Sequence, residues 1–223
     1  MKRILEREIM DNEEQAVAYA SADFSSSNQM FVDKLLEDYR PILKNVLDIG
    51  CGPGDVPIRL AKAKPSIEIT AVDASDPMLR LARKAVKDAG LTRQIKIIKG
   101  HVPGLVLKNH SYDAILSKDL LHHLPDPMVF WEQVKCLAKA EMVVYVMDLS
   151  RPQTKERARD IVQSVSGQEH PLLKQDFYDS LLAAFTVDEI RAQLREASLA
   201  LEAAQVSERH LLVKGLIRGW TNQ

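Results

Sequence analysis

The stretch from Val46 to Asp55, VLDIGCGPGD, limits the fold of this chain more than any other part of the sequence. The apolar run Asn45–Ile49 predicts a buried strand that ends at a glycine. Three glycines follow at alternate positions, namely Gly50, Gly52 and Gly54. They let the backbone turn sharply and approach a ligand without a Cβ in the way. Pro57 suits the first turn of a following helix, so the stretch predicts free N–H groups around a small polar ligand.

Two common nucleotide-binding patterns do not fit this loop. The dinucleotide fingerprint is G-x-G-x-x-G, but Asp55 stands where its third glycine would be. No Gly-Lys-Ser/Thr follows, which excludes the P-loop. The spacing therefore disfavours a nicotinamide-dependent reductase. The stretch instead resembles motif I of the class I S-adenosylmethionine (SAM)-dependent methyltransferases, in which a strand-end acid, here Asp48, precedes G-x-G-x-G.

A second acid follows at the distance that a doubly wound fold uses for the ribose of a nucleotide. The run Ile67–Val72 predicts a strand ending at Asp73, about twenty residues beyond the glycine loop. Asp76 is predicted to cap the next helix, with Pro77 in its first turn, which leaves Asp73 for the ribose hydroxyls.

The resemblance also implies the remaining cofactor contacts. A strand over Ile95–Lys99 leads to Gly100, and His101 stands where the family usually has an aspartate that binds the adenine amino group. A neutral imidazole nitrogen or the Val102 backbone are the two alternatives for the adenine. The expected cofactor contacts are Asp48, Gly50, Cys51, Gly52, Gly54, Asp73, Ala74, Gly100, His101, Val102 and Ser117. The cofactor that the family implies is SAM, with S-adenosyl-L-homocysteine (SAH) as the product.

A third segment bears on the methyl acceptor. The strand Tyr112–Ser117 opens into KDLLHHLPDP, which is similar to the LHHLPD segment of small-molecule methyltransferases of the ubiquinone and menaquinone type. The Asn-Pro-Pro-aromatic motif of methyltransferases acting on adenine or glutamine is absent, and so is the Pro-Cys pair of the cytosine type. The resemblance implies a small-molecule acceptor; an oxygen or nitrogen nucleophile is favoured because His122 or His123 with Asp148 would suit one as its base.

The carboxyl ends of two strands are expected to bring a histidine and an acid together. The run Glu141–Leu149 predicts a strand covered on both faces, and Asp148 lies near its end. If this strand lies beside the preceding one, His122 or His123 can meet Asp148 over the acceptor. A histidine–carboxylate pair is the usual arrangement of a general base. A core imidazole satisfied by backbone groups is the equally open alternative.

Two segments outside the motifs are expected to cover the crevice. Residues 1–40 are predicted to form a helical lid carrying Tyr19 and Phe24, and residues 150–185 a helical insertion over the acceptor. Candidate acceptor contacts in the insertion are Arg151, Phe177 and Tyr178. The alternative for each of these side chains is packing without a role in binding.

The rest of the chain completes the predicted fold. Leu201–Ser207 and His210–Ile217 predict a closing antiparallel pair, and the mildly basic stretch from Arg209 to Arg218 is expected to be a solvated face. Strands alternating with helices predict an α/β, Rossmann-like, doubly wound sheet of seven strands, mostly parallel. Residues 1–223 are expected to form a single methyltransferase domain.

Composition excludes several other classes. With 30 basic and 31 acidic residues the net charge is −1, so no general attraction to nucleic acid or acidic membranes is expected. Cys51 and Cys136 give neither a disulfide framework nor a metal-site spacing, so no metal is predicted. No run has the length of a membrane span, and a cytoplasmic protein, monomer or homodimer, is expected. The second hypothesis is a catalytically silent SAM-binding partner or regulatory module.

Overall fold

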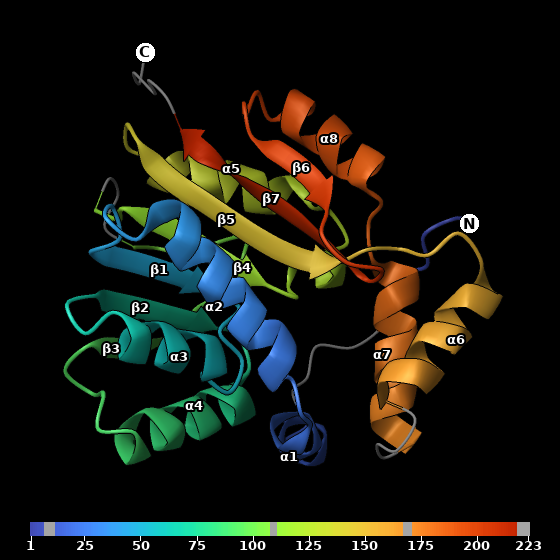
Figure 1. Cartoon of the computed structure of the whole chain (residues 1–223), viewed down its shortest axis with the longest axis horizontal. Helices are drawn as coiled ribbons and strands as arrows, with labels where there is room; N and C mark the ends of the chain where they lie inside the picture. Colours follow the sequence, from blue (N-terminus) through green and yellow to red (C-terminus); the bar gives the residue numbers. More distant parts are fainter. Residues whose placement is uncertain (7–11, 108–110, 167–170, 218–223) are drawn as a thin grey trace.

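A mixed sheet of seven strands carries the fold (Figure 1). The computed structural model describes residues 1–6, 12–107, 111–166 and 171–217. The strand order is β3-β2-β1-β4-β5-β7-β6. The strands are β1 (Asn45–Ile49), β2 (Glu68–Asp73), β3 (Ile95–Lys99), β4 (Ala114–Lys118), β5 (Met142–Leu149), β6 (Glu202–Gln205) and β7 (His210–Ile217).

The pairing of the strands confirms the predicted doubly wound sheet. β1 pairs in parallel with both β2 and β4, and β5 pairs in parallel with β4. β7 runs antiparallel to both β5 and β6. The strand order reverses between β1 and β4, and in such sheets the ligand crevice lies at the carboxyl ends of the strands beside this point.

Helices cover both faces of the sheet (Figure 1). One face packs against α2 (Ser25–Tyr39), α3 (Asp55–Ala63) and α4 (Asp76–Asp88), and the other against α5 (Met128–Leu137) and α8 (Val187–Glu196). All eight residues of β5 are buried, which explains why its sequence is apolar almost throughout.

Three further helices lie at the carboxyl edge of the parallel strands (Figure 1). They are α1 (Glu13–Ser21), α6 (Lys155–Ser166) and α7 (Pro171–Ala183), and a short 3-10 turn, η1 (Leu121–His123), follows β4. α7 contacts both α1 and η1. The predicted lid and insertion therefore meet over the end of the sheet. Within the described ranges, no helix has the length and apolar character needed to cross a membrane.

The cap of α4 differs from the prediction. Ser75 is the N-cap, its Oγ accepting a hydrogen bond from the Met78 N–H at 3.3 Å. Asp76 is the first helical residue instead, and its carboxylate pairs with Lys99. The prediction was wrong because serine and aspartate cap helices about equally well, so adjacent candidates cannot be separated by residue type.

Candidate active site

The three positions of the loop require glycine for different structural reasons. Gly50, Gly52 and Gly54 have φ angles of 82°, 52° and 90°, a region that disfavours side chains. A Cβ at Gly50 would lie 3.0 Å from the Leu120 Cβ, and one at Gly54 would lie 3.3 Å from the Ala82 Cβ. A Cβ at Gly52 would meet nothing within 4 Å. The first and third glycines are thus required by neighbouring protein atoms, whereas Gly52 faces open space.

Asp73 ties this loop to the end of β2. Its Oδ2 accepts from the Gly52 N–H at 2.8 Å, and its Oδ1 accepts from the Ser75 N–H at 2.9 Å. Burial raises the pKa of Asp73, although these backbone donors oppose the shift. Each oxygen retains capacity for a second hydrogen bond, as a ribose ligand requires.

Asp48 is a buried acid beside the glycine loop. Its Oδ2 has no hydrogen-bond partner among the described residues. Burial, with a smaller contribution from Asp73, raises the pKa of Asp48 to about 7. An unpaired buried carboxylate oxygen is costly unless a ligand completes its contacts. This oxygen therefore fits a ligand that brings a cation or a hydrogen-bond donor.

The raised pKa of Asp48 predicts a loss of stability as pH rises. Its folded pKa of about 7 exceeds the ordinary value of about 3.9, so between these values the folded state binds more protons than the unfolded state. We expect the Asp48→Asn variant to lack this dependence. The free energy of unfolding of the variant minus that of the wild type should therefore rise by about 2–3 kcal/mol between about pH 5 and pH 7. Urea unfolding of both proteins at several pH values measures this difference. Parallel pH profiles for the two proteins would contradict the expectation.

A first pocket, here called the cofactor pocket, lies along the glycine loop. Its empty volume, counted together with the adjoining solvent space, is about 1250 Å³. Asp48, Gly50, Cys51 and Gly52 line it, together with Tyr19 and Phe24 from the predicted lid. Gly54 is buried against Ala82 and does not line the wall.

Several expected cofactor residues do not line this pocket, namely Asp73, Ala74, Gly100, His101, Val102 and Ser117. The buried Ser117 donates its hydroxyl to the Ile49 carbonyl at 2.8 Å. The side chain of Leu105 covers Gly100, and the exposed His101 ring lies against Gly104. The structure gathers the loop and Asp48 at the pocket but leaves the predicted adenine contacts outside its wall.

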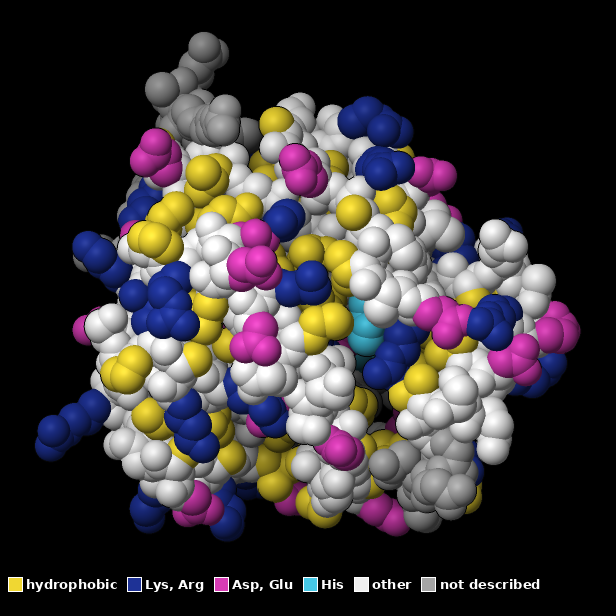
Figure 2. Space-filling model, in the orientation of Figure 1, with side chains coloured by type: hydrophobic (Ala, Val, Ile, Leu, Met, Phe, Trp, Pro, Cys, Tyr) yellow, Lys and Arg dark blue, Asp and Glu magenta, His cyan; other side chains and the backbone are white. Residues whose placement is uncertain are grey.

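A second pocket, the acceptor pocket, adjoins the first and encloses about 830 Å³ open to solvent. Tyr19, Phe24 and Asp119 line both pockets, and the rings of Tyr19 and Phe24 lie 4.7 Å apart. Figure 2 shows a histidine side chain in the hollow beside α6 and α7. The apolar and aromatic side chains of its wall are Tyr19, Phe24, Leu149, Val165, Leu173 and Phe177.

Asp119 marks the boundary between the two pockets. Although burial opposes ionisation, the ammonium of Lys118 lowers the pKa of Asp119 to about 2, and the two side chains form an ion pair. The Oδ1 of Asp119 is buried without a hydrogen-bond partner among the described residues. Sequence reasoning missed this residue, although it directly follows the strand end that was predicted to face the cofactor.

The structure brings His122 and Asp148 together. The His122 Nδ1 lies 2.6 Å from the Asp148 Oδ1, and both side chains are buried. The same carboxylate accepts from the Leu121 N–H at 2.6 Å and the Leu149 N–H at 2.7 Å. Burial disfavours the charged imidazole, but the Asp148 carboxylate outweighs it and raises the pKa of His122. The Nε2 of His122 has no partner within the described part of the chain, and the residue lines the acceptor pocket.

The first residues of the chain reach this site, which the sequence did not predict in detail. Arg3 donates to the carbonyls of His122 and Leu124, each at 2.9 Å, and its guanidinium lies over the Phe185 ring. The Glu6 Oε2 lies 2.8 Å from the His123 Nδ1. His123 therefore has a carboxylate partner of its own, supplied by a segment far away in sequence.

The start of β7 also lines the acceptor pocket, so the prediction of a solvated face was wrong for Arg209 and His210. His210 is buried because the antiparallel register places it opposite Leu149, and burial lowers its pKa to about 4. The Arg209 guanidinium lies 5.6 Å from the centre of the Phe177 ring. No hydrogen bond or ion pair of this guanidinium occurs among the described residues. Basic composition alone could not reveal the register of β7.

Of the three acceptor contacts predicted in the insertion, one lines the acceptor pocket and two do not. Phe177 lines the acceptor pocket, whereas Tyr178 packs against the α6–α7 cluster and faces Arg159. Arg151 is buried away from the pocket, donating to the Ala184 carbonyl at 2.9 Å and pairing with Glu189 at 2.5 Å. These two contacts mean that Arg151 fixes the start of α8.

Comparisons with known proteins agree with this geometry. A family model described as a methyltransferase domain matches residues 46–141. A ubiquinone biosynthesis O-methyltransferase of Actinobacillus pleuropneumoniae is 32% identical over 111 residues, 48% of this chain and 47% of the relative. A demethylmenaquinone methyltransferase of Porphyromonas gingivalis is 26% identical over 120 residues, 53% of this chain and 48% of the relative. The chain therefore matches about half the length of these relatives.

The fold comparison extends over nearly the whole chain. The crystal structure of a SAM-dependent methyltransferase from Aquifex aeolicus is similar to this protein with a TM-score of 0.68. It covers 92% of this chain and 98% of its own, at 18% identity. Residues 46–141 therefore match a methyltransferase domain, and the chain as a whole has the fold of the class I SAM-dependent methyltransferases, whose cofactor is S-adenosyl-L-methionine.

Proposed function

We propose that this protein transfers the methyl group of SAM to an oxygen or nitrogen atom of a small, largely aromatic acceptor. The observation that carries the proposal is the adjacency of two pockets that share Tyr19 and Asp119. One contains the glycine loop, and the other contains the free Nε2 of His122. Methyl transfer requires a donor and an acceptor held side by side and in line, and two adjoining pockets are suited to that task.

The cofactor pocket suits the charge of SAM. SAM carries a sulfonium and an ammonium group, and the pocket offers the unpaired carboxylate oxygens of Asp48 and Asp119. The Gly52 backbone would lie against the ligand with no side chain between them. Asp73 lies outside the wall of this pocket and would act on the ligand through the Gly52 backbone that it holds. When bound, SAM supplies the activated methyl group, while the protein orients it and excludes water.

The acceptor pocket suits a flat molecule with a polar edge. Phe24 and Phe177 with three aliphatic side chains supply apolar surface, and His122 supplies an acceptor atom for a proton. The Asp148 carboxylate keeps the proton of the imidazole on Nδ1, so Nε2 is the atom that would take the proton of an acceptor hydroxyl. The quinone-related names of the relatives support hydroxylated aromatic acceptors.

The test separates an enzyme from a silent binding module. Calorimetric titration with SAM and with SAH should give one site per chain, and incubation with SAM and a panel of catechols and hydroquinones should release SAH. The Phe177→Ala variant is expected to raise KM for the acceptor while the SAM affinity stays unchanged, because Phe177 lines only the acceptor pocket. SAM binding without SAH release for any hydroxylated or amino acceptor would favour the silent module.

A further inference from the structure

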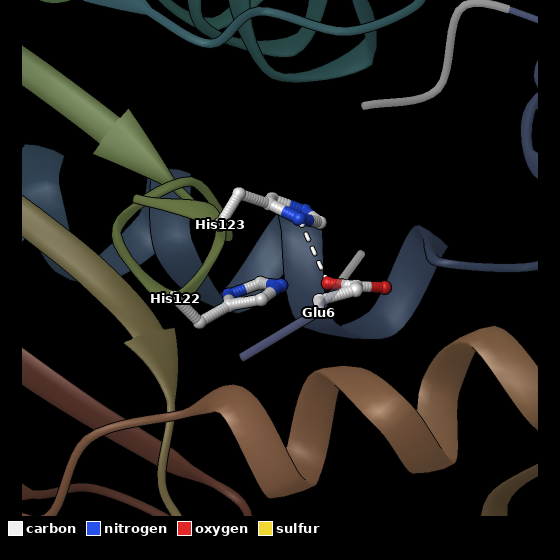
Figure 3. Close-up of side chains that lie close together, drawn as sticks. All are labelled: Glu6, His122 and His123. Carbon is white, nitrogen blue, oxygen red and sulfur yellow. Dashed lines mark ion pairs between the residues drawn. The ribbon is translucent and has the colours of Figure 1, made fainter. Parts of the chain in front are cut away.

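Three potential metal ligands converge at the mouth of the acceptor pocket. They are Glu6, from the start of the chain, and His122 and His123, from the turn after β4. One ligand atom of each lies within 4.8 Å of the other two. Figure 3 shows both imidazole rings directed toward the Glu6 carboxylate, and the ring centres lie 4.0 Å apart. Because Glu6 lies far from the two histidines in the sequence, no metal-ligand spacing in the sequence predicts this cluster.

Asp148 and Ser180 hydrogen-bond to the ligand residues and orient them, as neighbouring side chains do around a metal site. Metal-binding histidines usually donate their second ring N–H to a carboxylate, which fixes the tautomer and directs the free nitrogen toward the ion. Asp148 holds the His122 Nδ1 in this way at 2.6 Å. The Ser180 hydroxyl donates to Glu6, with its Oγ 3.2 Å from Oε1 and 3.3 Å from Oε2.

The unpartnered Nε2 of His122 points independently to a ligand. The His122 side chain is only 2% exposed, so water does not reach its Nε2 freely. This nitrogen nevertheless has no hydrogen bond in the described structure. A buried polar atom of this kind is costly when nothing contacts it. Glu6 and His123 contact each other at 2.8 Å and His122 contacts Asp148 through Nδ1, which leaves the Nε2 of His122 without a partner among the described residues.

We propose that Glu6, His122 and His123 bind a divalent transition-metal ion of the zinc class. One carboxylate oxygen and two imidazole nitrogens are a ligand set for Zn²⁺ and its neighbours, whereas Mg²⁺ and Ca²⁺ prefer oxygen ligands. Metal–ligand bonds of about 2.0–2.2 Å require the ligand atoms to move closer together than the observed spacing, by rotation of their side chains. Three protein ligands leave at least one position open. Since His122, His123 and Ser180 line the acceptor pocket, that position faces the acceptor.

The site has a consequence for the proposed function, and this step rests on that function. An ion bound to Nε2 prevents His122 from accepting a proton. The acceptor hydroxyl would coordinate at the open position, and its lowered pKa would release the proton to water before transfer. The oxygen then forms the new bond to the methyl carbon, and the carbon–sulfur bond of SAM breaks with its electron pair going to sulfur. The metal-binding site itself does not depend on methyl transfer.

The experiment measures metal binding directly, on the whole chain without an affinity tag and after dialysis against a chelator. Titration with Zn²⁺ should show one site per chain with a micromolar or tighter Kd, and Co²⁺ should give a visible absorption band. Glu6→Gln preserves shape but removes the anionic ligand, so we expect Zn²⁺ affinity to fall about 100-fold and the Co²⁺ band to disappear. Asp148→Asn, which removes only an outer contact, should weaken binding by about 10- to 100-fold.

The matched control is Glu13→Gln, an exposed carboxylate on α1 that pairs with Arg80 outside the cluster. It should bind Zn²⁺ like the wild type, and thermal melts should show that all variants remain folded. No Zn²⁺ binding by the wild type, or equal binding by the wild type and Glu6→Gln, would overturn the site. Binding without methyl transfer would overturn only the proposed function, whereas methyl transfer that persists without any metal binding would leave His122 as the base.

Discussion

Replacing Asp148 with asparagine is expected to lower the turnover of methyl transfer about 10²- to 10⁴-fold, the range of a positioned proton acceptor. Asp148 accepts three hydrogen bonds, from His122 and from the backbone N–H groups of Leu121 and Leu149. Asparagine has one acceptor oxygen and no charge, so it cannot satisfy all three donors or stabilise a positive imidazole. The loss follows whether Nε2 accepts a proton or binds a metal, because both need an oriented ring. The measurement is single-turnover SAH formation with saturating SAM.

The SAM affinity of this variant should stay close to that of the wild type, since Asp148 does not line the cofactor pocket. A useful control is Asp113→Asn. Asp113 also accepts a backbone N–H bond, from Asn45 at 2.8 Å, but it precedes β4 at the opposite edge of the sheet. Both variants should lose about 1–3 kcal/mol of stability from unpaired donors. Only the Asp148 variant should lose turnover, and equal losses in both would remove the pair from the mechanism.

The second large effect is expected on cofactor affinity, from the Gly52→Ala substitution. The free protein has room for the added methyl group, because nothing lies within 4 Å of that position. In the complex the methyl group would occupy space that the ligand needs, and it would push the charged groups of the ligand away from their partners, Asp48 among them. Hydrogen bonds to charged groups are worth about 1.5–3 kcal/mol each. We therefore expect the Kd for SAM, measured by calorimetry, to rise about 10- to 100-fold.

Gly90→Ala provides a closely matched control for this substitution. Gly90 also has a positive φ, 71°, and a Cβ there would likewise meet nothing within 4 Å. Both variants should therefore lose about 1–2 kcal/mol of stability through backbone strain alone. Gly90 follows α4 and does not line the cofactor pocket. If the two variants bound SAM equally well, the glycine loop would not be the cofactor contact that we propose.

Local signals allowed much of the fold to be predicted. The strand at Asn45–Ile49 and the strand at Ile95–Lys99 have the predicted bounds, because each is a short apolar run ended by a glycine or a polar residue. Thr186 and Glu189, three residues apart at the start of α8, form a complete capping box, a pattern that the residue types and their spacing indicate by themselves. The meeting of His122 with Asp148 required only that β4 and β5 be neighbours in a parallel sheet.

The parts of the site that sequence reasoning missed depend on contacts between distant segments. Glu6 reaches His123 across more than a hundred residues, and nothing in its own neighbourhood predicts this contact. His210 is buried only because β7 runs antiparallel to β5 in one particular register. Arg151 was a candidate acceptor contact with packing as the alternative, and the structure shows packing, because its guanidinium pairs with Glu189 of the α8 capping box.

The two pockets share several residues, but part of the acceptor pocket comes from a segment that the cofactor pocket does not use, and this affects how the protein can change. The region matched by the methyltransferase-domain model, residues 46–141, contains the glycine loop, whereas Val165, Leu173 and Phe177, which line only the acceptor pocket, lie outside it. Acceptor preference can then diverge during evolution while the donor half stays constant. A laboratory library restricted to these three positions should likewise yield new acceptor preferences with little change in the Kd for SAM.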